Sequence, residues 1–497
     1  MLLVSRGFLA VLFCWSVALV PAMGSGAPAA RGLEATQAAQ PAGAVQPAGL
    51  AGRWEGYIDV VGTRLAIIVN IADGSAGLKA TIDIPQQAAA GLPLTNLRHE
   101  PPKVHFELPA GPGLAVFDGE MKGDSIAGTF EQAGVKGTFE LKRTGAVPAP
   151  PPPGPPPPYK QEEIKIQSGA ITLAGTLTLP PSGGPFPAVI LITGSGAQNR
   201  DEEVFGVKPF RMIADHLTRQ GIAVLRCDDR GVGGSTGSTS QASSADFADD
   251  ALAEVQFLEG RPEIDKARIG LLGHSEGGLV APLAASRSAD VAFIILLSGP
   301  AVTGERIMLA QAELIMRAGG ASDEQVRHNM EIQKRIFGAV RTGQGWDEAA
   351  ALLRIDVKAG LDAASEAQRK AIPDQEAFIK SRVDGQLASS RTPWFKFFLD
   401  YDPAPTLAKV RCPVLAFFGE RDLQVPVGLN RDVMEQALKS GGNRNYTIEV
   451  MARANHLYQD AKTGGVQEYT ILKKEFVPEL LPLVSAWILK QGPAGLR

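Results

Sequence analysis

The chain of 497 residues contains only three cysteines, Cys14, Cys227 and Cys412. Cys14 lies in an apolar N-terminal segment that we expect to be removed, which leaves one pair in a protein expected to be exported. Such a pair invites a disulfide assignment. However, Cys227 follows the apolar run 222–225, whereas Cys412 precedes the apolar run 414–418. In a parallel sheet these positions lie at opposite rims, so we expect two free thiols.

The chain also lacks a strong net charge, a metal-type cluster of Cys and His, and internal repeats. Its formal net charge is -4, with 49 basic and 53 acidic residues. This balance provides no electrostatic basis for binding nucleic acid or an anionic membrane surface. We therefore expect no metal and no nucleic-acid partner. The oligomeric state is left open.

No hydrophobic run is long enough for a comfortable membrane span. The apolar segment 7–20 has about 14 residues, short of the ~20 that a spanning helix needs. Arg6 precedes it and small residues follow it at 22–27, which is typical of a secretory signal. We expect residues 1–24 to be a signal peptide and the protein to be periplasmic or secreted, without stable membrane insertion after cleavage. An uncleaved membrane anchor is the alternative.

Three further segments precede residue 160. Residues 25–50 are rich in Ala, Gly, Pro and Gln, which predicts a disordered tether. Residues 51–145 contain about eight short alternating runs, which predict a small antiparallel β domain, either a barrel or a sandwich. We expect this domain to pack or to shield the substrate side, with ligand binding as the alternative. Residues 146–159 form a proline-rich, semi-rigid linker. The predicted core of the β domain is aromatic: Trp54, Phe106, Phe117, Phe130 and Phe139.

From residue 160 to 497 the pattern predicts an α/β domain. After an opening antiparallel hairpin, apolar runs alternate with amphipathic helices, which indicates a mostly parallel sheet with helices on both faces. The alternation stops for residues 302–402, whose helical texture predicts an inserted cap. Within it, the aromatic segment 392–399 either forms an apolar pocket wall or docks the cap on the sheet. A final helix is predicted over 469–490.

A tight turn joins a strand to a helix at residues 271–278, Leu-Leu-Gly-His-Ser-Glu-Gly-Gly. Gly273, Ser275 and Gly277 form the G-x-S-x-G pattern of a nucleophile elbow, in which a strained turn exposes the serine hydroxyl at the carboxyl edge of a sheet. The glycines are needed because the turn crowds its neighbours. Ser275 is thus the predicted nucleophile.

The expected partners of Ser275 follow the next two strands. Acyl transfer needs a base and an acid that orients it, in the chain order Ser, Asp or Glu, His for this fold class. Asp422 lies in the loop after 414–418, with Glu420 as its competitor, and His456 follows 446–450. Of the six histidines, only His456 has this position. His274 is expected to point away from Ser275.

An oxyanion hole needs two backbone N–H donors. Glu276, after the nucleophile, is predicted to supply one. The loop that follows the strand at 188–193 supplies the other, with Ser195 as first choice and Gly196 as second. The loop 226–235 has glycines but lacks the Lys-Ser/Thr ending of a phosphate-binding loop. It is interpreted as a structural loop braced by Arg–Asp pairs.

Taken together, these motifs resemble the α/β-hydrolase superfamily, in particular its serine aminopeptidase-like and dienelactone-hydrolase-like branch. The resemblance rests on 273–278, 419–422 and 455–456, and two loops, 193–201 and 228–233, resemble those of bacterial esterases in that branch. It covers about residues 162–489 and implies an α/β-hydrolase fold with a helical cap. It also implies carboxylester hydrolysis through an acyl-enzyme, without a cofactor. Thr193-Gly194 departs from the His-Gly that many members have before the oxyanion donor.

We thus expect an exported serine esterase that acts on a small-molecule ester. The same triad serves serine peptidases and amidases, so a short peptide substrate is the alternative. A third possibility is a binding protein with a vestigial hydrolase domain, against which the complete set of Ser275, Asp422 and His456 argues.

Overall fold

The computed structural model describes residues 49–60, 63–74, 77–84, 89–109, 114–132, 135–145, 156–364, 366, 369, 372, 374–469 and 471–492. The predicted signal peptide and most of the predicted tether and linker lie outside these residues. The chain divides into two compact units, one built on the strands of the first 145 residues and one on a second sheet. Each is described by itself.

Eight antiparallel strands form a closed barrel, in which the last strand pairs with the first. The prediction of an antiparallel all-β domain is therefore confirmed. Alternate side chains of each strand point inward, because the side-chain period of a strand is two residues. The strands are β1 (Gly52–Val60), β2 (Thr63–Gly74), β3 (Gly77–Ile84), β4 (Ala89–Glu100), β5 (Lys103–Leu108), β6 (Ala115–Lys122), β7 (Ser125–Gln132) and β8 (Val135–Gly145).

Aromatic side chains form the core of the barrel, as the sequence predicted. Trp54, Phe106, Phe117 and Phe139 are fully buried, and Phe130 is nearly so. Phe106 and Phe117 are direct cross-strand partners, and their rings stack with centroids 4.6 Å apart. Aromatic pairs of this kind stabilise a sheet beyond the area that they bury.

The second unit contains an eight-stranded, mostly parallel sheet in the order β16-β15-β14-β13-β11-β12-β10-β9. The first two strands in the sequence, β9 and β10, form the predicted antiparallel hairpin, and β10 also pairs antiparallel with β12. The remaining neighbours are parallel, which confirms the predicted fold class. The strands are β9 (Lys160–Ser168), β10 (Ile171–Leu179), β11 (Phe186–Ile192), β12 (Ala223–Cys227), β13 (Ile264–His274), β14 (Phe293–Leu297), β15 (Val414–Gly419) and β16 (Tyr446–Met451).

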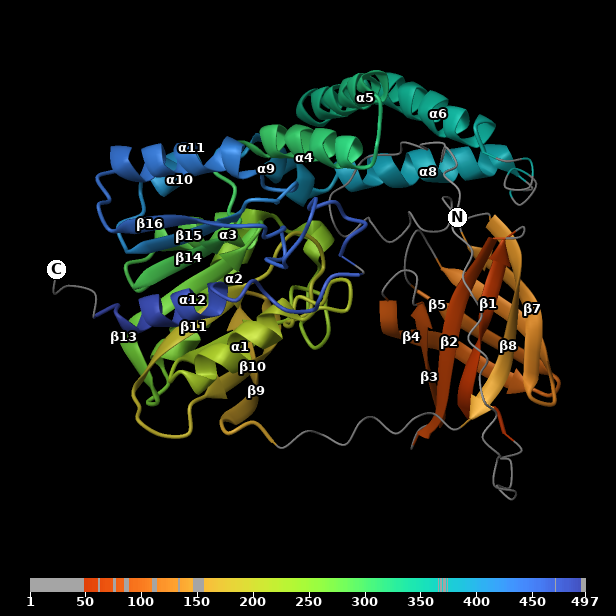
Figure 1. The fold of residues 1–497 in the computed structure, drawn as a ribbon, viewed down its shortest axis with the longest axis horizontal. Coiled ribbons are helices and arrows are strands. Elements are labelled where there is room, and N and C mark those ends of the chain that lie inside the picture. The colour runs from red at the N-terminus through yellow and green to blue at the C-terminus, as the bar shows by residue number, and fades with distance from the viewer. Residues whose placement is uncertain are drawn as a thin grey trace. The chain divides into compact units, whose positions relative to one another are not determined.

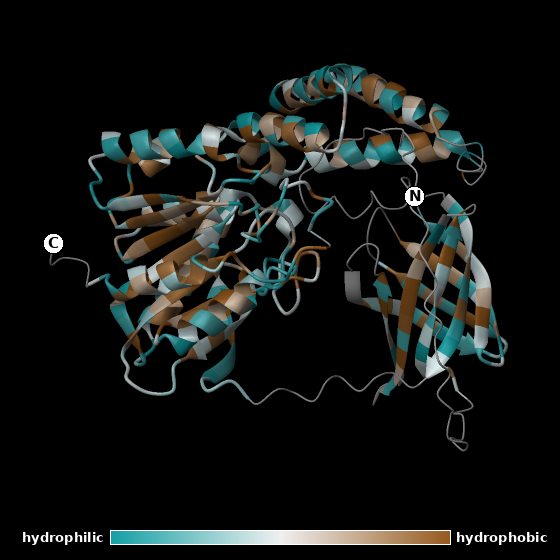
Figure 2. Cartoon of the chain, in the orientation of Figure 1, coloured by the Kyte–Doolittle hydropathy of each residue, from teal (hydrophilic) through white to brown (hydrophobic). Residues whose placement is uncertain are grey.

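Helices cover both faces of this sheet (Figure 1). On one face, α1 (Pro209–Arg219) and α12 (Leu480–Leu489) pack on a cluster that includes Val189 and Leu191. On the other, α2 (Ser244–Glu259), α3 (Gly277–Ala285) and α11 (Val427–Ser440) pack on a cluster that includes Ala188 and Ile190. Because both faces are buried, the strands β11, β14 and β15 are apolar throughout (Figure 2).

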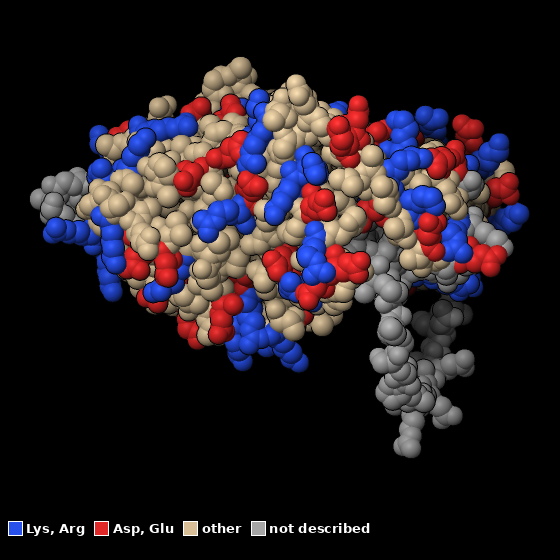
Figure 3. Space-filling model, turned by 90° about the horizontal axis from the view of Figure 1, so that it is seen from above, with Lys and Arg blue, Asp and Glu red and all other residues tan. Residues whose placement is uncertain are grey.

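A helical insertion separates β14 from β15, as predicted for the cap. It contains α4 (Gly304–Ala318), α5 (Asp323–Thr342), α6 (Trp346–Asp362), α8 (Gln375–Ser390) and α9 (Pro393–Asp400), and the short α10 (Ala404–Leu407) follows. α5 begins with a capping box of Ser322 and Gln325 and ends at Gly343 in the left-handed conformation. On the face shown in Figure 3, acidic and basic side chains intermingle, consistent with the small net charge.

The C-terminal helix is shorter than predicted. The pattern predicted a helix over 469–490, but α12 begins only at Leu480. The described residues 471–479 form turns and irregular structure, and Pro478 disfavours helical geometry at Val477. In addition, Gln459 donates a hydrogen bond to the carbonyl of Lys473. Among the described helices, none is long and apolar enough to cross a membrane.

Both described cysteines are free, as predicted. Cys227 ends β12 and Cys412 precedes β15. Burial raises the pKa of Cys412 to about 12 and that of Cys227 well above its ordinary value. Because the thiolate is the reactive form, we expect neither to react with Ellman's reagent at pH 8 until guanidinium unfolds the protein. Stoichiometric labelling of the native protein within minutes would contradict this expectation.

Candidate active site

Ser275 occupies a strained turn between β13 and α3. Its φ angle is +53°, in the left-handed region that residues other than glycine rarely adopt. The turn permits only glycine at the positions two residues before and two residues after Ser275. A Cβ at Gly273 would lie 1.9 Å from the carbonyl oxygen of Gly277, and a Cβ at Gly277 would lie 2.2 Å from that of Ile192. The turn therefore has the geometry of a nucleophile elbow, and Ser275 lines a pocket.

Asp422 and His456 meet at the carboxyl edge of the same sheet. Asp422 follows β15 and His456 follows β16, and both are buried. The Nδ1 atom of His456 lies 2.8 Å from Oδ2 of Asp422. His456 lines the same pocket as Ser275, so the fold brings the three predicted residues together. The competitor Glu420 is exposed, and its carboxylate accepts a hydrogen bond from the backbone N–H of Arg453.

The surroundings of Asp422 favour its charged form. Burial opposes ionisation, but the charge and hydrogen bond of His456 outweigh it, and the pKa of Asp422 is lowered. Oδ1 also accepts hydrogen bonds from the backbone N–H groups of Gln424 and Val425, at 2.8 and 2.9 Å. An ionised carboxylate makes Nδ1 of His456 the donor. The Nε2 atom is then left to accept a proton.

The predicted oxyanion donors, Ser195 and Glu276, both line the pocket, whereas Gly196 does not. The backbone N–H of Gly194 is already engaged, because it donates to Oε1 of Glu202 at 2.7 Å. Within the described part of the chain, the N–H groups of Ser195 and Glu276 have no acceptor. Glu276 also immediately precedes α3, where N–H groups and the helix dipole favour negative charge.

The loop after β12 braces the oxyanion loop, in agreement with the structural role expected for it. Arg200 binds Asp228, with Nη2 2.8 Å from Oδ2, and Arg226 pairs with Asp201. Asp229 accepts hydrogen bonds from the Thr193 hydroxyl at 2.7 Å and the Gln198 N–H at 2.8 Å. These interactions hold the backbone of the oxyanion loop in place, and they leave the substrate to other residues.

The side chain of Glu276 links the elbow to the cap. Its Oε1 accepts hydrogen bonds from the Ser244 hydroxyl at 2.6 Å and from the indole N–H of Trp394 in α9 at 2.7 Å. Burial raises the pKa of the same carboxyl group. In the same helix, Phe398 lines the pocket. The aromatic segment 392–399 therefore both docks the cap and forms an apolar wall.

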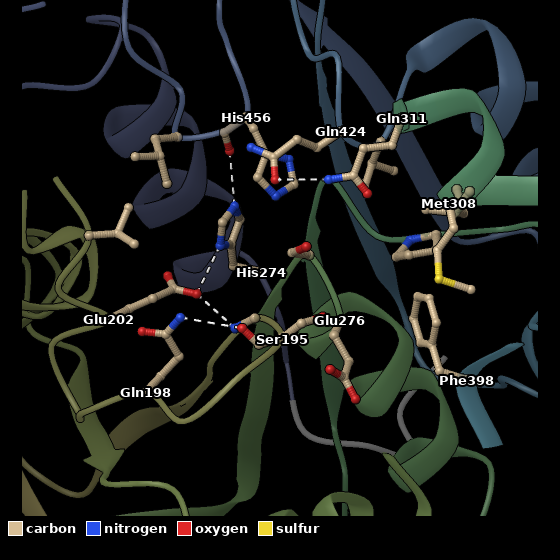
Figure 4. Close-up of a pocket in the computed structure, with 17 residues that line it drawn as sticks. Ser195, Gln198, Glu202, His274, Glu276, Met308, Gln311, Phe398, Gln424 and His456 are labelled. Atoms are coloured by element: carbon tan, nitrogen blue, oxygen red, sulfur yellow. Dashed lines mark hydrogen bonds and ion pairs between the residues drawn. The ribbon is translucent and has the colours of Figure 1, made fainter. Parts of the chain in front are cut away.

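The pocket has two different walls (Figure 4). Near His456 lie two buried glutamines, with Nε2 of Gln311 3.4 Å from Oε1 of Gln424. The other wall is apolar and includes Met308 and Phe398. The cavity volume is about 50 Å³, which on this measure is room for roughly four water molecules. No group of described residues has the composition of a metal site.

Sequence reasoning missed two buried residues of the site, Glu202 and His274. His274 is expected from the sequence to point away from Ser275 and has no predicted role. Its ring lies in the pocket wall, with its centroid 4.7 Å from that of His456. Glu202 carried no signal except its place in the loop after β11, because its partner His274 lies 72 residues further along the chain.

Residues 207–341, which include Ser275 but neither Asp422 nor His456, match the family described as serine aminopeptidase, S33. Over 382 residues the chain is 26% identical to Esterase EstD of Thermotoga maritima, covering 76% of each protein. Over 137 residues it is 31% identical to an uncharacterized protein of Mycobacterium tuberculosis, covering 27% of this chain and 44% of that one. Among solved structures, the esterase Pf2001 of Pyrococcus furiosus has 18% identity and a TM-score of 0.42, covering 67% of this chain and 92% of its own.

Proposed function

We propose that this member of the α/β-hydrolase superfamily is an exported esterase that cleaves carboxylic esters through an acyl-enzyme, with Ser275 as nucleophile. One observation carries the proposal. The elbow serine and the buried His456–Asp422 pair line or adjoin one pocket, in the chain order that this fold requires. Export rests on the signal-like residues 1–24.

The proposed reaction has two halves. His456 takes the proton of the Ser275 hydroxyl as its oxygen attacks the ester carbonyl, and Asp422 stabilises the imidazolium that forms. The N–H groups of Ser195 and Glu276 hold the oxyanion. His456 then protonates the departing alcohol. In the second half-reaction His456 activates water, which releases the acid and frees Ser275.

The two walls of the pocket suggest the substrate. The leaving alcohol must lie next to His456, which protonates it, and therefore beside Gln311 and Gln424. The acyl chain then lies against Met308 and Phe398. A cavity of this size suits a short acyl group. The similarity to Esterase EstD supports ester hydrolysis, whereas the match to the serine aminopeptidase family keeps a peptidase or amidase as the second candidate.

A substrate panel tests the proposed function. We expect p-nitrophenyl acetate and butyrate to be hydrolysed with a kcat/KM at least about tenfold above that for the decanoate, since each methylene that a pocket cannot accept costs ~1–3 kcal/mol. Met308→Ala should move the optimum to longer chains. Met330→Ala, a change on α5 away from the pocket, should leave it in place. Faster turnover of aminoacyl-p-nitroanilides than of esters would favour the peptidase.

A further inference from the structure

A second buried histidine–carboxylate pair lies beside the first. Oε1 of Glu202 is 2.9 Å from Nδ1 of His274 and accepts the N–H of Gly194 as well. On its other side, Nε2 of His274 is 2.9 Å from the backbone carbonyl oxygen of His456. Both side chains are at least nine-tenths buried. One imidazole ring therefore joins the loop after β11 to the loop after β16 (Figure 4).

The partners of His274 determine its protonation state. A carboxylate and a carbonyl oxygen can only accept hydrogen bonds. With Glu202 ionised, both ring nitrogens therefore carry hydrogen, which makes the ring an imidazolium. Burial opposes this charge, but the adjacent Glu202 carboxylate outweighs it, and the pKa of His274 is raised.

We propose that His274 is a cationic positioning residue that, held by Glu202, fixes the oxyanion loop and the base loop relative to Ser275. The proposal rests on the proposed function. Asp422 orients the ring of His456, whereas His274 holds its main chain. Glu202 accepts the Gly194 N–H and leaves the neighbouring Ser195 N–H to the oxyanion.

Orientation accounts for this arrangement better than stability does. Desolvation of two buried charges offsets most of their attraction, so a buried ion pair is a weak source of stability. Oε2 of Glu202 has no hydrogen-bond partner within the described chain, a further cost. In return, three chain segments meet at the ring of His274, the residue directly before the nucleophile. A displacement of about 1 Å between catalytic groups can lower a rate ~10²-fold.

The protonation state is tested directly on the wild-type enzyme. In ¹⁵N NMR spectra at pH 7.5, both ring nitrogens of His274 should have the chemical shifts of protonated imidazolium nitrogens, assigned by comparison with His274→Asn. A neutral ring at this pH would overturn the proposal. This measurement requires neither catalysis nor a variant that preserves activity, so its outcome is separate from that of the proposed function.

Kinetics test the positioning role. Glu202→Gln keeps the shape of the side chain but removes its charge, and we expect kcat on p-nitrophenyl butyrate to fall about 10- to 100-fold with little change in KM. The matched control is Glu203→Gln, because Glu203 is exposed and pairs with Lys208. Unchanged kcat in folded Glu202→Gln would overturn the role of the pair, whereas loss of activity in Ser275→Ala tests the esterase itself.

Chemical rescue distinguishes charge and hydrogen bonding from space filling. Since His274 lines the pocket, added imidazole can reach the space left in His274→Ala. Imidazole should restore part of kcat, and less as the pH rises above ~7, where it loses its second proton. 1-Methylimidazole, which cannot donate from both nitrogens, should restore much less. Equal rescue by both compounds at all pH values would contradict the proposal.

Discussion

Ser275→Ala is expected to lower kcat on p-nitrophenyl butyrate by about 10⁶-fold, the loss seen when a serine nucleophile is removed from a complete triad. The hydroxyl of Ser275 is the only part of the elbow that forms the acyl-enzyme in the proposed reaction. The pocket and the oxyanion N–H groups remain, so a slow residual hydrolysis above the uncatalysed rate is expected.

The comparison needs a matched control and a check of folding. Ser240 is exposed on the short turn after β12 and bonds only to Ser238 among its described contacts. Ser240→Ala should therefore retain wild-type turnover. The two variants and the wild type should have similar melting temperatures. Turnover by a folded Ser275→Ala variant at more than a few per cent of the wild-type rate would refute the proposed mechanism.

Asp422→Asn is expected to lower kcat by about 10⁴-fold while leaving the fold intact. The amide oxygen can still accept the N–H of Val425, which turns the NH2 group toward Nδ1 of His456, where the carboxylate now accepts. His456 would then carry its proton on Nε2 and could not accept the proton of Ser275.

Glu420→Gln is the control for this change, because Glu420 lies two residues away in the same loop. It is exposed and bonds to the backbone of Arg453 rather than to His456. Steady-state kinetics of both variants with one ester, at several pH values, suffice. A larger loss in Glu420→Gln than in Asp422→Asn would exchange the two assignments.

The sequence was sufficient to predict the fold class, the mostly parallel sheet and an antiparallel β domain, because their signals are local. Period-two alternation indicates strands with one buried face, and apolar runs between amphipathic helices indicate a parallel sheet. The approach of Asp422 and His456 also followed from local signals, since loops after successive parallel strands open at the same edge. The catalytic roles of these residues stay a proposal.

Other parts of the site could not be predicted. The contact between Glu202 and His274 joins distant loops, and neither residue belongs to a pattern that names the other. The bond from Trp394 to Glu276 depends on how the cap packs, which no periodicity determines. The last helix was predicted too long for a different reason. The apolar residues around Pro478 favoured a helix through this proline, although proline locally disfavours helical geometry.

The elbow also limits how this enzyme can evolve. Gly273 and Gly277 have no room for a Cβ, and the proposed chemistry requires a serine at position 275. Selection can therefore act on only two of the five turn positions, 274 and 276. Their side chains are the ones that contact the base loop and the cap. A lineage can thus retune its acyl specificity or its loop alignment at positions adjacent to the nucleophile without altering the nucleophile itself.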